Sequence, residues 1–147
     1  MVEKLTNRVS QAWIQFHRTQ RLLLEGVEVA LKRQKLPPIA WYDVLVELNR
    51  DPEMGLRQFE IGGRILLSKH NLSRLLDRLE KEALVRRRAC SEDGRGNMIT
   101  ITAKGQTTLQ AMWPVYKSAI EENFAGKLEA KDLKELLRIL GKINAVS

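Results

Sequence analysis

The chain has 147 residues, the size of one domain, and this length argues against a large multidomain enzyme. Hydrophobic residues make up 44% and charged residues 29%, a composition typical of a soluble globular protein and not of a disordered, collagenous or membrane-embedded one. Lys and Arg number 25 against 18 Asp and Glu, and the net charge of +7 favours a polyanionic partner such as nucleic acid or a membrane face.

The cysteine content and the N-terminal residues indicate a cytoplasmic protein. The chain has 1 cysteine, Cys90, so neither an internal disulfide nor a cysteine-based metal cluster can form. The first residues carry scattered charges and lack the apolar core of a signal peptide, and no stretch approaches the roughly 20 apolar residues needed to span a bilayer. We therefore expect a cytoplasmic protein without a membrane partner.

Apolar residues at helical spacing predict a long first helix over residues 6–34. At 1.5 Å per residue this helix would be roughly 43 Å long, whereas a compact globule of this size is about 38 Å across. The helix would overhang its own domain, and the simplest cover for its apolar stripe is a second copy of the chain. The stripe comprises Val9, Trp13, Phe16, Leu23, Val27 and Ala30.

Three shorter helices are predicted before residue 83. Pro37 and Pro38 end the first helix, and a second helix follows that stops near residues 51–52. Residues 56–63 predict a short third helix. The fourth, over residues 69–82, has a capping hydroxyl at Ser68 and buries one face of leucines. These leucines are Leu72, Leu75, Leu76 and Leu79.

A β-hairpin and two long helices are predicted in the remainder of the chain. Residues 84–90 are short and Arg-rich, residues 98–102 are β-branched and alternating, and Asp-Gly and Gly-Asn pairs lie between them. The spacing of apolar residues predicts two helices within residues 103–147. The fold class expected is therefore mainly α-helical with one small β-hairpin.

The short helices and the hairpin have the pattern of a winged helix-turn-helix. The helix over residues 69–82 is slim enough for a major groove about 12 Å wide, and its N-terminal end would meet base edges and phosphates. Arg95, between two glycines at the hairpin tip, would enter the minor groove, where negative potential favours arginine. The residues expected at the major groove are Ser68, Lys69, His70, Asn71, Ser73 and Arg74.

Further arginines are candidates for contacts with phosphates. Arg78 lies on the same predicted helix, and Arg88 belongs to the run 86–88 in the hairpin. In one interpretation, at least one arginine of this run contacts a phosphate. In a simpler one, all three are solvated strand positions.

Three motifs follow one another towards the end of the segment 56–105. Arg-Leu-Glu stands at 78–80, Asp-Gly-Arg-Gly at 93–96, and Ile-Thr-Ala-Lys-Gly at 101–105. In order and spacing they resemble the signature of the MarR family of bacterial transcriptional regulators. The flanking long helices are also similar to the dimerisation helices of that family, so the resemblance covers nearly the whole chain.

The resemblance implies a single MarR-like domain over residues 1–147. Its helical dimerisation region would comprise about 1–35 and 103–147, and its winged-helix DNA-binding lobe about 36–102. The resemblance implies a homodimeric regulator, most often a repressor, that binds a pseudo-palindromic operator in double-stranded DNA.

The resemblance also implies roles for single residues. Asp93 would hold the wing in shape, and Thr102 would cap the helix that follows. Ala83 stands where the family usually has glycine, so we expect the fourth helix to end differently. Gly94 stands where the family often has a second basic residue.

Aromatic residues predicted to lie between the two regions are candidates for an effector pocket. The family often binds small aromatic or anionic molecules in such a crevice, where His17, Arg18 or Arg21 would pair with a carboxylate. The alternative is that most of these aromatics are core. The pocket candidates are Trp13, His17, Trp41, Tyr42 and Trp113.

Catalytic, metal and cofactor sites are not expected. The two histidines are His17 and His70, and no phosphate loop, Gly-x-Ser-x-Gly motif or zinc-ligand spacing occurs. Cys90, next to an arginine run, is either a redox sensor or an incidental thiol. One alternative function stays open: a helical protein-interaction module, such as an anti-repressor whose winged helix does not bind DNA. The missing cation at Gly94 supports it.

Overall fold

The computed structural model describes residues 4–65, 71–89 and 97–145. The chain forms two compact units, which we call the helical unit (residues 1–27 and 116–147) and the winged unit (residues 28–115). The division falls within the helices α1 (Asn7–Arg33) and α5 (Ala103–Asn123), so each of them contributes to both units. In the described part of the chain, no helix combines the length and the apolar character needed to cross a bilayer.

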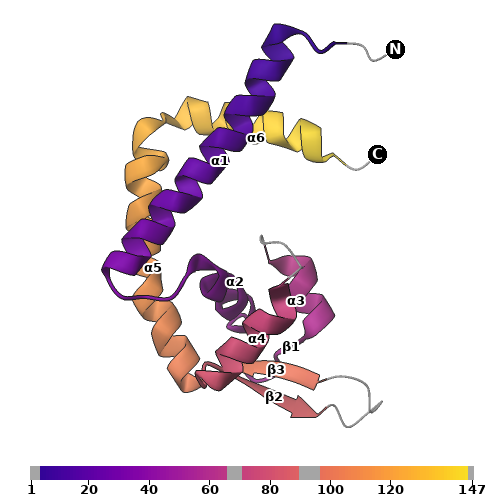
Figure 1. Ribbon diagram of the computed structural model, residues 1–147, viewed down its shortest axis with the longest axis vertical. Coiled ribbons are helices and arrows are strands. Elements are labelled where there is room, and N and C mark those ends of the chain that lie inside the picture. Colours follow the sequence, from indigo (N-terminus) through magenta and orange to yellow (C-terminus); the bar gives the residue numbers. More distant parts are fainter. Residues whose placement is uncertain (1–3, 66–70, 90–96, 146–147) are drawn as a thin grey trace. The chain divides into compact units, whose positions relative to one another are not determined.

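In its described residues, the winged unit has three short helices and a small sheet, together with the end of α1 and the start of α5. Figure 1 shows the short helices on one face of the sheet, which is antiparallel with the strand order β1-β3-β2. This is the mainly helical winged fold that the sequence predicts. The elements are α2 (Ile39–Leu48), β1 (Leu56–Arg57), α3 (Gln58–Arg64), α4 (Leu72–Lys81), β2 (Val85–Ala89) and β3 (Asn97–Ile101).

The core of the winged unit lies between the sheet and these helices. Leu45, Leu76 and Leu79 are fully buried there, together with Ile99 of the central strand. Because successive residues of a strand point to opposite faces, β3 turns Ile99 towards the helices and its neighbours away from them. One face of the sheet is therefore core and the other is open.

The strand β1 departs from the prediction. We expected one helix over residues 56–63, but Leu56 and Arg57 pair with Ile99 and Met98, and the helix begins at Gln58. Gly55 makes the turn into this strand with φ of 71°, a left-handed conformation suited to glycine. A strand of two residues is too short to show alternation, so the sequence pattern carried no signal for it.

The helical unit combines the first part of α1 with the end of α5 and with α6 (Ala130–Asn144). Val27 and Ala119 are buried in it. Many other large apolar side chains are exposed in the single chain, and of these Val9, Trp13 and Phe16 repeat at helical spacing. They include Val9, Trp13, Ile14, Phe16 and Leu22 on α1, and Leu137, Ile139 and Ile143 on α6.

Candidate nucleic-acid interface

Helix α4 has a buried leucine face and an exposed polar face. Leu72, Leu76 and Leu79 are buried and Leu75 is partly buried, which confirms the predicted leucine set. The opposite side of the helix is accessible to a partner. The exposed residues of α4 are Ser73, Arg74, Asp77, Arg78, Glu80 and Lys81, and Asn71, also exposed, directly precedes the helix.

Gln58 connects the start of α3 to the first turn of α4. Its Nε2 donates a hydrogen bond of 2.8 Å to Ser73 Oγ. Because the Ser73 hydroxyl accepts in this bond, its own proton remains available to a base or phosphate. The predicted site included Ser73 and missed Gln58, since no local pattern relates two residues 15 positions apart.

Arg87 connects the hairpin to α4. Its guanidinium nitrogen lies 2.8 Å from Asp77 Oδ1 and 3.5 Å from Glu80 Oε1, and the Arg87 side chain is only 23% exposed. The two carboxylates on α4 neutralise the charge of Arg87, and Arg87 in turn offsets their negative charge. The arginine run 86–88 is thus not a set of three equivalent solvated positions.

Arg88 makes a different contact. Its guanidinium donates to the backbone carbonyl oxygen of Glu53 at 3.3 Å. The residue is exposed, and a carbonyl does not neutralise its charge. Arg88 therefore stays a candidate for a phosphate contact.

Helix α4 ends in a left-handed turn at Ala83, which has φ of 61°. The Leu84 N–H donates to the Leu79 carbonyl at 2.9 Å, and the Ala83 N–H donates to the Glu80 carbonyl at 2.9 Å. This is the Schellman arrangement, in which glycine is usual. Contrary to our expectation, the alanine does not change how the helix ends; it adopts the left-handed conformation at a cost of about 1 kcal/mol.

Thr102 joins the hairpin, α4 and α5. Its Oγ1 accepts a hydrogen bond of 3.0 Å from the Gly105 N–H, which confirms the predicted cap of α5. The same hydroxyl donates to the Ala83 carbonyl oxygen at 2.6 Å. At Gly105 a β-carbon would collide with the carbonyl oxygen of Leu84. The Thr-x-x-Gly motif therefore lets the start of α5 lie close to the end of α4.

Several predicted interface residues lie outside the described residues, and they stay predictions from the sequence. They are Ser68, Lys69, His70, Asp93 and Arg95, together with Cys90.

The aromatic residues proposed for an effector pocket divide between the two units. Trp13 and His17 belong to the helical unit, with ring centroids 4.4 Å apart. Tyr42 and Trp113 belong to the winged unit, where their rings stack at 6.2 Å, and Trp41 packs against the core. A shared pocket stays a prediction.

A depression of about 570 Å³ lies beside the exposed face of α4. It is lined by residues of α3, α4 and the sheet, among them Gln58, Ser73, Asp77 and Arg87. Within the described ranges, no three His, Cys, Asp or Glu side chains are grouped to hold a metal ion.

Asp43 of α2 is a buried acid in the winged unit, with 7% of its surface exposed. Burial raises the pKa of Asp43 to about 6, and the charge of Glu47, one helical turn away, contributes to the same shift. The stability of the winged unit should therefore depend on pH below neutrality.

Comparison with known proteins agrees with this architecture. A family model described as "MarR family" matches residues 35–96 of the chain. The crystal structure of AbsC, a MarR family transcriptional regulator from Streptomyces coelicolor, superposes with a TM-score of 0.84 at 29% identity, covering 97% of this chain and 95% of AbsC. By these two matches the chain is similar to the MarR family of transcriptional regulators.

Two further relatives are informative. Sco3205, a MarR family transcriptional regulator from Streptomyces coelicolor, was crystallised in complex with DNA; it has a TM-score of 0.84 and 27% identity, covering 100% of this chain and 94% of Sco3205. The transcriptional regulator HosA from Escherichia coli is 27% identical over 130 residues, which are 87% of this chain and 93% of HosA.

Proposed function

We propose that this protein is a sequence-specific DNA-binding transcriptional regulator that acts as a homodimer on a pseudo-palindromic operator. The observation that carries the proposal is helix α4, which buries its leucine face and leaves the opposite face polar and accessible. The crystallisation of Sco3205 with DNA supports the same use of the fold.

The exposed face of α4 suits the major groove. The helix is about 15 Å long at 1.5 Å per residue, and the groove is about 12 Å wide. Arg74 and Arg78 lie one turn apart on this face and would contact guanine edges or phosphates. Ser73, oriented by Gln58, would donate to a neighbouring base or phosphate. Arg95 would read the minor groove from the wing.

Exposed apolar side chains on the helical unit support a homodimer. Trp13 and Phe16 on α1 are 65% and 52% exposed in the single chain, and Leu137 and Ile143 on α6 are each 71% exposed. Soluble monomers rarely expose large apolar patches, and a second copy related by a two-fold axis would cover identical faces. The two α4 helices would then enter successive major grooves about 34 Å apart.

Repression with release by a small ligand is the regulatory scheme that we propose. A ligand that prefers dimers whose α4 spacing does not match the operator would lower operator occupancy. The aromatic and histidine side chains Trp13, His17, Trp41, Tyr42 and Trp113 are the candidates for holding an aromatic or anionic effector. The protein would act in the cytoplasm as a regulator and not as an enzyme.

The test compares two double variants on DNA from the region upstream of the protein's own gene. Arg74→Gln/Arg78→Gln removes two charges from the exposed face of α4, and we expect binding to weaken at least about tenfold. Lys131→Gln/Lys134→Gln removes the same charge from exposed positions on α6 and should bind like the wild type. If both variants lose the same DNA affinity, the effect is due to net charge alone, which would contradict the assignment of α4 to the major groove. If the wild type binds no DNA, the protein-interaction alternative is favoured.

A further inference from the structure

The outer face of the sheet, turned away from α2, α3 and α4, carries arginines from two strands. Arg88 of β2 and Arg57 of β1 both pair with Met98 of β3, and Arg86 pairs with Thr100. Paired residues lie on the same face of a sheet, and Met98 and Thr100 alternate with the buried residues of β3. Arg57, Arg86 and Arg88 therefore share this surface, which we call the outer arginine face.

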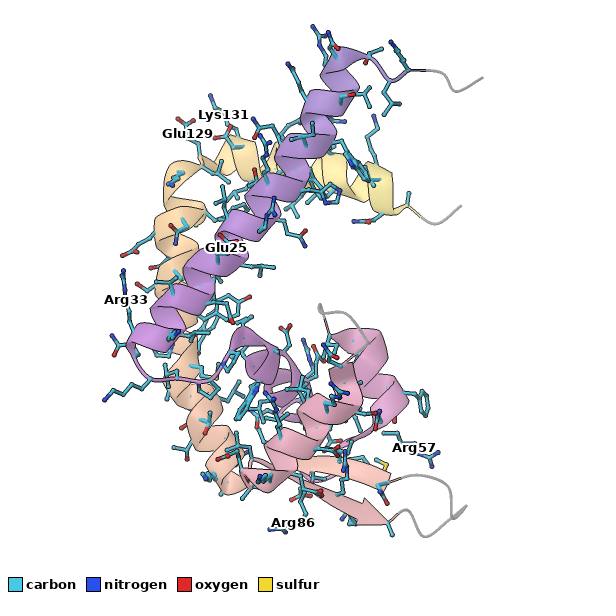
Figure 2. The ribbon with its side chains drawn as sticks, in the orientation of Figure 1. Glu25, Arg33, Arg57, Arg86, Glu129 and Lys131 are labelled. Atoms are coloured by element: carbon cyan, nitrogen blue, oxygen red, sulfur yellow. The ribbon has the colours of Figure 1, made fainter. Side chains whose placement is uncertain are left out.

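The three positions lie close together. Strand β3 lies between β1 and β2, so Arg57 and Arg88 are separated by two strand spacings of about 4.8 Å each, and Arg86 and Arg88 are about 7 Å apart along β2. Figure 2 shows Arg57 and Arg86 projecting outward from the winged unit. Within the described residues, neither Arg86 nor Arg88 forms an ion pair with an acidic side chain; Arg88 bonds instead to the Glu53 carbonyl. The positive charge of Arg86 and Arg88 on this surface is thus exposed.

Arg87 shows that this arrangement is not a general property of the strand. Its side chain points to the inner face and meets both Asp77 and Glu80. The charge of the inner arginine of β2 is thus compensated by acidic side chains, whereas in the described residues the outer Arg86 and Arg88 meet no acidic side chain. The positive charge of Arg86 and Arg88 attracts a polyanion.

We propose that the outer arginine face binds the phosphodiester backbone of DNA that flanks the operator, beyond the half-site contacted by α4. This inference rests on the proposed function, because it takes the wing to lie on DNA. The face is part of the same hairpin as the wing tip, so flanking DNA is the polyanion nearest to it when the operator is bound.

The chemistry of the face favours DNA over an acidic protein. Protein interfaces are centred on buried aromatic or aliphatic anchors. Among the described strand residues, this face has Thr100 and the half-buried Met98 between the arginines. Phosphate contacts need no such anchor, since they depend on cationic side chains and on the release of counterions.

The experiment compares two duplexes, one limited to the operator and one that extends the same operator by about one helical turn on each side. The wild type should bind the extended duplex at least about fivefold more tightly at low salt, with a steeper salt dependence, because each added phosphate contact contributes about 0.9 to the slope of log K against log salt. The Arg86→Gln variant, which leaves Arg88 in place, should bind the short duplex like the wild type and should lose most of the preference for the extended one. Lys131→Gln, with the same change of net charge, should keep the preference.

The outcomes separate this inference from the proposed function. If the wild type binds the short duplex specifically and gains no affinity from the flanks, the inference about the outer arginine face is overturned, while the proposed function still holds. An outer-face variant that keeps the preference, or that loses affinity equally on both duplexes, would also overturn it. A wild type that binds neither duplex would remove the proposed function itself. Thermal unfolding of each variant verifies that it is folded.

Discussion

Arg87 of β2 and Asp77 of α4 form an ion pair of 2.8 Å, which joins the wing to the helix proposed to read DNA. Both residues occupy elements that would touch different grooves. Their contact therefore helps to set the distance between the two parts of the interface. The pair is only half shielded, since the Asp77 side chain is 66% exposed.

We predict that Arg87→Gln lowers operator affinity more than it lowers stability. Water screens the ion pair at the exposed Asp77, so its loss should cost within about 1 kcal/mol of unfolding free energy. Chemical denaturation and fluorescence anisotropy measure the two effects. A double-mutant cycle with Asp77→Asn should give a coupling energy above about 0.5 kcal/mol. Strict additivity would show that the pair does not matter in solution.

Ala83→Gly should stabilise the protein by about 1 kcal/mol. Ala83 holds the left-handed position at the end of α4, where glycine avoids the clash of the β-carbon. Ala111→Gly, at an exposed position within α5, is the matched control and should destabilise by about 1 kcal/mol. If both substitutions shift the midpoint of urea unfolding in the same direction, the assignment of the turn is wrong.

Two helical glycines should respond oppositely to alanine. Gly105→Ala places a β-carbon against the Leu84 carbonyl and should destabilise by several kcal/mol, on the order of 3 or more. At Gly63, in α3, a β-carbon meets nothing within 4 Å, so Gly63→Ala should stabilise by about 0.5–1 kcal/mol. Thermal unfolding of both variants checks this, and a neutral Gly105→Ala would refute the close approach.

The contribution of Asp43 to the free energy of unfolding should fall as pH rises from about 4 to about 6. The folded state holds the Asp43 proton up to a pKa of about 6, whereas the unfolded chain releases it near 3.8, so the folded state binds more protons in this window. Asp43→Asn removes the titration and should raise stability at pH 7.5, by up to about 3 kcal/mol. Denaturation at pH 4.5 and 7.5 is the measurement. A variant with the same pH dependence as the wild type would contradict this role.

Phe16→Glu should weaken dimerisation and operator binding together. Phe16 is 52% exposed in the single chain, so the substitution leaves the fold of one protomer intact. Its charge would be buried if a second copy covers α1. Sedimentation velocity and circular dichroism report assembly and fold separately. A wild type that binds its operator as a monomer would contradict the dimer.

The sequence predicted the elements whose signal is periodic. Leu72, Leu76 and Leu79 repeat at helical spacing, so the buried face of α4 follows from periodicity. The hairpin follows from β-branched alternation in β3 and from the Asp-Gly turn signal. Strand β1 was missed because it has only two residues and forms through the turn at Gly55 and pairing with β3.

Side-chain partners were less accessible to sequence reasoning. The inward orientation of Arg87 follows from the strand pattern. Arg87 stands two positions after the buried Val85, and residues two positions apart lie on the same face of a strand. The Gln58–Ser73 bond had none, since it depends on how α3 and α4 pack. For the residues of the predicted interface that lie outside the described ranges, the sequence is the whole basis.

The most direct test of the central claim is fluorescence anisotropy of the wild-type protein on DNA from upstream of its own gene, with scrambled DNA of the same length as competitor, at two salt concentrations. Binding that survives the competitor at both salt concentrations is the result expected for a sequence-specific regulator, with affinity that falls steeply as salt increases. Equal and salt-sensitive binding to both DNAs, or no binding to either, would contradict specific recognition of this region.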